Sequence, residues 1–169
     1  LTNYLNKNHI TLNSNTKTHH FCNNQSLRFG DTAITFYQPC SSSHLNKNNQ
    51  SLVFKITKNK LSMLFTGDIE EKVETLLTKT YGSHLDSTIL KVPHHGSQTS
   101  STIPFLKSVN PDHSIVPAGI LNRFGHPNPK VINRLKDLST VWETHRLGAI
   151  IITIKHNLKI KTFNLKRPF

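Results

Sequence analysis

Long apolar runs are absent from this sequence, and cysteines are scarce. No stretch of about 18 apolar residues exists, so the chain predicts no membrane-spanning helix, and no signal peptide is visible. The spacing of Cys22 and Cys40 matches no zinc knuckle and is compatible equally with one disulfide and with two free thiols. Because the chain starts at Leu1 and not at Met, we expect it to be a piece of a longer polypeptide.

Acidic residues are also few. The chain has 9 Asp and Glu against 21 Lys and Arg, which gives a formal charge of +12 before any of its 11 histidines is protonated. This excess favours a polyanionic partner, either nucleic acid or an anionic membrane surface. The same balance also fits simple solubility or a lysine-rich, AT-biased genome, so charge alone leaves the partner open. The length of 169 residues suits one domain with a substantial core.

Short apolar runs separated by polar turns predict a mixed α/β domain over residues 27–169, preceded by a polar segment, 1–26, that continues from a missing upstream part. The predicted strands cover 27–37, with a turn at Gly30-Asp31, and 51–57, 61–65, 88–92, 114–118, 141–143, 149–154 and 158–163. The predicted helices run from just after Asp68 to Gly82, over 100–110 and over 131–138. Helices in this order are expected to cover one face of a sheet.

The tetrad His94-His95-Gly96-Ser97 is the most informative motif. It follows the apolar run 89–93, so it stands where a predicted strand ends. Imidazole is the commonest metal ligand in proteins, and glycine lets the backbone approach a ligand closely. Ligand sites of α/β proteins lie at such strand ends. The motif therefore predicts a site for metal and phosphate.

Two further residues stand at similar junctions. Asp68 ends the apolar strand 61–65, and His126 lies in a tight turn before Pro127. We predict that Asp68, His94 and His126 are catalytic, with Asp68 and His94 as ligands of Zn or Mn. Such a metal activates water and neutralises charge on a phosphodiester. The structural alternatives are that Asp68 caps the following helix and that His126 braces its turn.

A second set of polar residues is predicted to contact the phosphate: His95, Ser97, Asn122, Arg123, His126 and His145. The guanidinium group suits phosphate because it presents a planar fork of donors. As alternatives, Asn122 and Arg123 are ordinary surface residues, and His145 is a solvated strand-end residue. The acids Glu70, Glu71 and Glu74 are expected on the solvated face of their helix.

Four segments carry a family resemblance: LFTGDIEEKVETLL, ILKVPHHGSQTSSTIPFLKSVNPD, NRFGHPNPKVINRL and THRLGAIIITI. Together, within about residues 27–155, they resemble the C-terminal metallo-β-lactamase-like domain of ComEC, the DNA-uptake channel protein of competent bacteria, with the Gram-negative branch as the nearest match. By position, Asp68 corresponds to the bridging carboxylate of the family's TGD motif, and His94 to the metal histidine of HHGS, whose other positions His95 and Ser97 match. Asn122, Arg123 and His126 match its NRxGHP segment.

This resemblance implies a metallo-β-lactamase-like αββα sandwich with a two-metal site for Mn or Zn. It implies hydrolysis of DNA phosphodiester bonds, degrading the strand that is not transported during natural transformation. The implied partners are DNA and the membrane channel portion of the same or a companion polypeptide. The implied location is the inner membrane, with this domain facing the periplasm.

The chain departs from the family pattern at its start. The family's first metal motif, HxDxDH, is absent, and His19-His20 does not fit it. The first strands of the sandwich are missing too, so the chain resembles the C-terminal half, and the N-terminal half of the domain is an expected partner. An incomplete site also fits a non-catalytic DNA-binding or docking module. Gram-negative members of the family often carry a cysteine at the positions that correspond to residues 49–52. The resemblance suggests that Cys40 replaces this cysteine and forms a disulfide with Cys22. A periplasmic location would favour such a disulfide.

Overall fold

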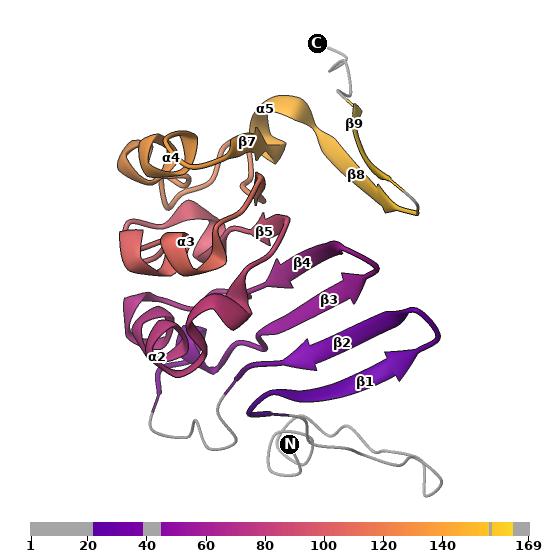
Figure 1. Ribbon diagram of the computed structural model, residues 1–169. Coiled ribbons are helices and arrows are strands. Elements are labelled where there is room, and N and C mark those ends of the chain that lie inside the picture. The colour runs from indigo at the N-terminus through magenta and orange to yellow at the C-terminus, as the bar shows by residue number, and fades with distance from the viewer. Residues whose placement is uncertain (1–21, 39–44, 156, 164–169) are drawn as a thin grey trace, which may run out of the picture.

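A computed structural model of the chain describes residues 22–38, 45–155 and 157–163 (Figure 1). Its main feature is a seven-stranded sheet in the order β1-β2-β3-β4-β5-β6-β7, and β8 and β9 form a separate two-stranded sheet. The strands are β1 (Gln25–Phe29), β2 (Thr32–Phe36), β3 (Phe54–Lys58), β4 (Leu61–Phe65), β5 (Ile89–Lys91), β6 (His113–Val116), β7 (Thr140–Glu143), β8 (Ala149–Ile154) and β9 (Leu158–Phe163).

The first four strands pair antiparallel, with tight turns between β1 and β2 and between β3 and β4 and a longer connection, 37–53, between β2 and β3. Gly30 and Asn59 have positive φ angles of 58° and 55°, the conformation that reverses the chain between adjacent strands. The hairpin predicted around Asn59 is confirmed as β3 and β4. The turn predicted at Gly30-Asp31 is confirmed, and it divides the strand region 27–37 into β1 and β2.

From β4 onward the strands pair parallel, and each connection contains a helix. The helices are α2 (Glu71–Tyr81), α3 (Ile103–Val109), α4 (Pro129–Lys136) and α5 (Thr144–Leu147), with short 3-10 turns η1 (Asn48–Gln50), η2 (Gly82–Leu85) and η3 (Pro93–Gly96). Figure 1 shows α2, α3 and α4 stacked along one side of the sheet. Leu64 and Leu90 of the sheet belong to the same buried core as Leu77, Phe105 and Leu135 of these helices.

Helix α2 ends at Gly82 as predicted, but its start differs from the expectation. Glu70 occupies the N-cap position with no side-chain capping bond, so Asp68 does not cap the helix. Glu71 is exposed, as expected for a solvated face. Glu74 is fully buried, and its carboxylate accepts hydrogen bonds from the backbone N–H groups of Ser101 and Thr102 at the start of α3. The expectation of a solvated Glu74 is therefore wrong.

The predicted closing strands 149–154 and 158–163 are confirmed as β8 and β9, which form a hairpin apart from the helix layer (Figure 1). The large mixed sheet with several helices agrees with the predicted α/β class, whereas the αββα sandwich stays a prediction. Residues 1–21 of the predicted N-terminal segment lie outside the described residues. Among the helices that the structure describes, none is both long and apolar enough to cross a lipid bilayer.

Candidate functional site

The predicted site residues follow four neighbouring parallel strands. Asp68 comes after β4, the two histidines of the tetrad after β5, the loop 118–128 after β6, and His145 after β7. Parallel strands present their carboxyl ends at the same edge of a sheet, where α/β proteins bind ligands. The topology therefore brings these segments, distant in sequence, to one edge.

A backbone junction at Gly67 fixes the distance between the ends of β4 and β5. The carbonyl oxygen of Gly67 accepts hydrogen bonds from the backbone N–H of His94, at 3.3 Å, and from Nζ of Lys91. Gly67 has a φ of 55°, and a Cβ atom there would lie 2.4 Å from Cβ of Ser51. Only glycine fits this junction, because both the backbone conformation and the space exclude a side chain.

The carboxylate of Asp68 lies between two cationic or polar side chains. Its Oδ1 atom is 3.6 Å from Nζ of Lys91 and 3.6 Å from Nε2 of His95. Burial lowers the pKa of the Lys91 ammonium, and the neighbouring Asp68 opposes this shift. Sequence reasoning missed Lys91, although its place at the end of β5, three residues before the histidine pair, is a signal that could have identified it.

The imidazole of His94 faces a carboxylate from the start of α2. Its Nδ1 lies 3.4 Å from Oε1 of Glu70. Glu70 in turn accepts hydrogen bonds from Nδ2 of Asn46, at 2.9 Å, and from Oγ1 of Thr99, at 3.0 Å. The bond from Asn46 is the main cause that lowers the pKa of Glu70. The expectation that Glu70 lies on a solvated helix face is therefore wrong, and Glu70 belongs to the surroundings of the site.

The imidazole of His95 is oriented by the backbone. Its Nδ1 lies 2.6 Å from the carbonyl oxygen of Pro117. A carbonyl can only accept, so Nδ1 carries the hydrogen, and Nε2 is the ring nitrogen that faces Asp68. His94 and His95 both have left-handed φ angles, 45° and 55°. Such conformations cluster at functional sites, where the surrounding structure holds them.

The loop after β6 places His126 next to His94. The ring centroid of His126 lies 5.5 Å from that of His94, and the ring of Phe124 stacks on it at 5.9 Å. Burial lowers the pKa of His126, and the neighbouring His94 and His95 lower it further. Its buried Nδ1 finds no hydrogen-bond partner among the described residues. A neutral imidazole with an unsatisfied nitrogen is the form that binds metals.

The other predicted phosphate contacts have structural partners. Asn122 shapes the loop, because its Oδ1 accepts from the backbone N–H of His126, at 2.8 Å, and its Nδ2 donates to Gly119 and His126 carbonyls. Arg123 is exposed and lies over the ring of Phe124, at 4.9 Å. Ser97 is buried, and its hydroxyl bonds that of Thr99 at 3.0 Å. Their roles toward phosphate stay predictions.

His145 lies across a groove of about 520 Å³ from the loop that carries His126. Its Nε2 is 3.5 Å from Oε2 of the buried Glu143, whose Oε1 is 3.4 Å from Nη1 of Arg146. Asn122 lines the side of the groove that carries His126. A smaller cavity of about 230 Å³ lies between His95, Asn122 and His126. The candidate site thus shares His126 with a groove that is also lined by Lys136 and by Glu143 with its partners His145 and Arg146.

The side chains of Asp68, His94, His95 and His126 are of the types that bind divalent metals. They offer one carboxylate and three imidazoles, the ligands that Zn and Mn use. The buried Nδ1 atom of His126 makes no hydrogen bond within the part of the chain that is described, whereas Nδ1 of His94 faces Glu70. In those same residues, however, no three side chains of His, Cys, Asp or Glu lie close enough together to form a ready metal site. The donors present therefore fit part of a metal centre.

Cys22, just before β1, is disulfide-bonded. Cys40, the other cysteine of the chain, lies outside the described residues.

Comparisons with known proteins agree with the motifs. The chain is 32% identical to competence protein ComA of Neisseria gonorrhoeae over 115 residues, which are 68% of this chain and 17% of that protein. It is 31% identical to ComE operon protein 3 of Bacillus subtilis over 144 residues, 85% of this chain and 18% of that protein. It is 39% identical to recombination protein 2 of Haemophilus influenzae over 88 residues, 52% of this chain and 11% of that protein.

No family model matches the chain. The matched segments span less than a fifth of the length of these relatives. They nevertheless cover half or more of this chain in each comparison, and the relatives come from three separate bacteria. The chain therefore belongs to the ComEC family of competence proteins.

Proposed function

We propose that this chain is part of a metal-dependent nuclease domain that hydrolyses DNA phosphodiester bonds during ComEC-type DNA uptake. The observation that carries the proposal is the gathering of the Asp68 carboxylate with the imidazoles of His94, His95 and His126 at one edge of the sheet. These groups come from three separate strand-to-helix connections. A purely structural role would not require four such donors in one place.

The metal, Mn or Zn, would activate water and offset charge on the phosphodiester. Asp68 and His94 would hold it, with Glu70 fixing the ring of His94 through Nδ1. The backbone carbonyl of Pro117 would orient His95 in the same way. The family resemblance implies a second metal in the complete domain.

The groove beside His126 suits a polymer strand. It has a volume of about 520 Å³ and is lined by His145, Arg146 and Lys136 as well as by the loop. The chain's formal charge of +12 favours a polyanion. Asn122, Arg123, His95 and Ser97 would contact the phosphate from the near side. These features support DNA over a small neutral substrate.

The relatives' names support the biological setting. Competence protein ComA and recombination protein 2 point to uptake and recombination of DNA in their own organisms. We infer that this chain acts in natural transformation, degrading the strand that is not transported. It would do so as the C-terminal half of a metallo-β-lactamase-like αββα sandwich beside a membrane channel, facing the periplasm. The N-terminal half would supply the first metal motif.

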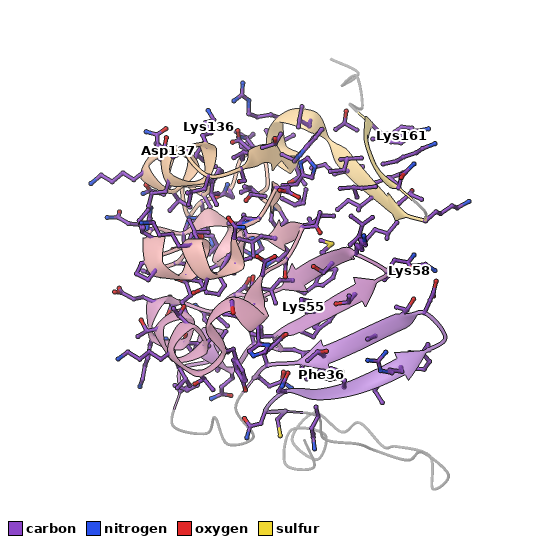
Figure 2. All side chains as sticks on the ribbon, viewed as in Figure 1. Phe36, Lys55, Lys58, Lys136, Asp137 and Lys161 are labelled. Atoms are coloured by element: carbon purple, nitrogen blue, oxygen red, sulfur yellow. The ribbon has the colours of Figure 1, made fainter. Side chains whose placement is uncertain are left out.

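Metal binding and cleavage test this function together. Titration calorimetry with Mn²⁺ on the 169-residue chain should show binding that Asp68→Ala and His94→Ala abolish and that Asp137→Ala, an exposed acid after α4, leaves intact (Figure 2). The longer domain that includes this chain should cut labelled DNA with Mn²⁺, and Asp68→Ala should stop it. Uncut DNA, or equal cleavage by Asp68→Ala, would contradict the proposal.

A non-catalytic DNA-binding or docking module is the second candidate. It is favoured because, in the described residues, no three potential ligands converge on one point. This candidate predicts DNA binding that weakens steeply with salt, since phosphate contacts release counterions. It also predicts binding that ignores chelators. Loss of all DNA binding on addition of EDTA would argue against it.

A further inference from the structure

The hairpin of β8 and β9 has two different faces. Ile150, Ile152 and Ile160 share one face and are half-buried. The opposite face carries Ile151, which is 48% exposed, and Phe163, which is 54% exposed. The half-buried isoleucines account for the stability of the hairpin, and they do not account for two large apolar side chains in solvent.

The exposed face is also cationic. Lys155, Lys159 and Lys161 line a hollow of about 550 Å³ together with Ile151 and Phe163. From residue 144 to the end of the chain the sequence contains no Asp or Glu. Lys159 and Lys161 project to the same side because they are two residues apart in a strand. Figure 2 shows Lys161 on the hairpin, on the opposite side of the view from Lys136 and the helix layer.

The hairpin lysines have no acidic partner among the described residues, whereas two lysines of the seven-stranded sheet do. Lys58 pairs with Asp31 at 3.2 Å, and Lys91 pairs with Asp68 at 3.6 Å. Among the residues whose positions are described, none of the three hairpin lysines forms an ion pair. Their charge is therefore available to an external anion.

We propose that the exposed face of the β8–β9 hairpin binds single-stranded nucleic acid. Surfaces that bind single strands combine cationic grooves that follow the backbone with aromatic side chains on which bases stack. The lysines supply the first element, and Phe163 supplies the second. An anionic membrane surface fits less well, because interfacial binding needs a broad apolar face, and the isoleucine face of this hairpin is already half-buried.

The hairpin starts close to the candidate site in sequence. Ala149 follows His145 and Arg146, which line the groove next to His126. The hairpin therefore begins three residues after Arg146, a residue that lines the groove. The inference deepens the proposed function, and it rests on that function for the choice of DNA as the polymer.

Anisotropy of a fluorescent oligo-dT with the 169-residue chain in EDTA tests the surface without any metal-dependent cleavage. The double variant Lys159→Gln/Lys161→Gln should weaken binding about tenfold and reduce the salt slope by about 1.4, because two phosphate contacts are lost. The control Lys72→Gln/Lys79→Gln removes the same charge from exposed positions on α2 and should change the affinity less than about twofold.

A second variant and its control test the contribution of Phe163 to oligo-dT binding. Phe163→Leu should weaken oligo-dT binding about tenfold, because base stacking on an aromatic ring is lost. Phe29 on β1 is 62% exposed at the far edge of the sheet, and Phe29→Leu should leave the affinity unchanged. All six substituted positions in these four variants are exposed, so folding is expected to persist.

Two results would overturn the inference. One is an equal loss of oligo-dT binding in both lysine pairs, which would mean diffuse attraction by net charge. The other is unchanged oligo-dT binding together with lost binding to phosphatidylglycerol vesicles in Lys159→Gln/Lys161→Gln, which would mean a membrane surface. Failure of the nuclease proposal shows instead as uncut DNA with metal, and it leaves the binding result in EDTA unaffected.

Discussion

Glu70 and His94 form a carboxylate–imidazole pair, with 3.4 Å between Oε1 and Nδ1. Glu70 is itself fixed by Asn46 and Thr99, so the pair is anchored from two other segments. Carboxylates placed in this way fix the ring orientation and tautomer of metal-binding histidines and raise their basicity. His94 is therefore presented to the site through Nε2.

We expect Glu70→Gln to lower the affinity of the chain for Mn²⁺ about 10–100-fold, because loss of an outer-shell carboxylate typically has that effect. Titration calorimetry measures the affinity. Glu71→Gln is the matched control, since Glu71 is exposed one residue further along α2. Equal affinities for the two variants would contradict the role of Glu70.

Gly67→Ala is expected to destabilise the chain more than Gly30→Ala. Both glycines have positive φ angles, 55° and 58°, so each alanine carries a backbone cost of about 1 kcal/mol. A Cβ at Gly67 also meets Ser51 at 2.4 Å, whereas nothing lies within 4 Å at Gly30. We expect a further cost of about 1–3 kcal/mol at Gly67 from overpacking. Urea unfolding of both variants measures the difference, and equal values would refute it.

Asn122→Ala and Arg123→Ala separate a structural role from a phosphate contact. Asn122 makes hydrogen bonds that hold the loop at His126, so its removal should lower the free energy of unfolding by about 1–2 kcal/mol. Arg123 contacts only the ring of Phe124 among the described residues, so its removal should change stability by less than about 0.5 kcal/mol. Arg123→Ala should instead weaken DNA binding. Undiminished DNA affinity would exclude Arg123 as a phosphate contact.

The burial of Glu74 is expected to make the stability of the chain depend on pH. Burial raises the pKa of its carboxyl above the ordinary value of 4.5, despite the hydrogen bonds from Thr102 and Ser101. The folded state therefore binds the proton more tightly than the unfolded state, and this contribution to stability is present below pH 4.5 and lost as pH rises through the folded pKa. The stability of the wild type relative to Glu74→Gln should fall as pH rises from about 4 to 7. Denaturant unfolding at both pH values checks this, and a constant difference would contradict it.

Local signals predicted the regular elements where a turn residue and an apolar pattern agree. The hairpin at Asn59 and the end of α2 at Gly82 follow from such signals. The turn at Gly30-Asp31, which separates β1 from β2, follows from the same kind of signal. Helix α5 was missed because four residues are too few to show helical periodicity.

The site motifs were visible in the sequence, whereas the residues that support them were not. Glu70 meets Asn46 and Thr99, which are 24 and 29 positions away in the chain. Glu74 meets the start of α3 across 27 positions. Helical periodicity assigns both acids to a solvated face, because it contains no information about which loop packs against that face. Lys91 was missed for a related reason, since its carboxylate partner belongs to another strand connection.

In the seven-stranded sheet, each strand lies beside the strand that precedes it in the chain. Pairing any two neighbours therefore closes only the single connection between them, and the entropy lost on closure grows slowly with its length. Paired strands are therefore closer in sequence than they would be in an order that skips strands, which favours faster folding. As the ribosome releases the polypeptide, each new strand meets a partner that has already emerged, so the sheet can grow strand by strand from β1 during synthesis.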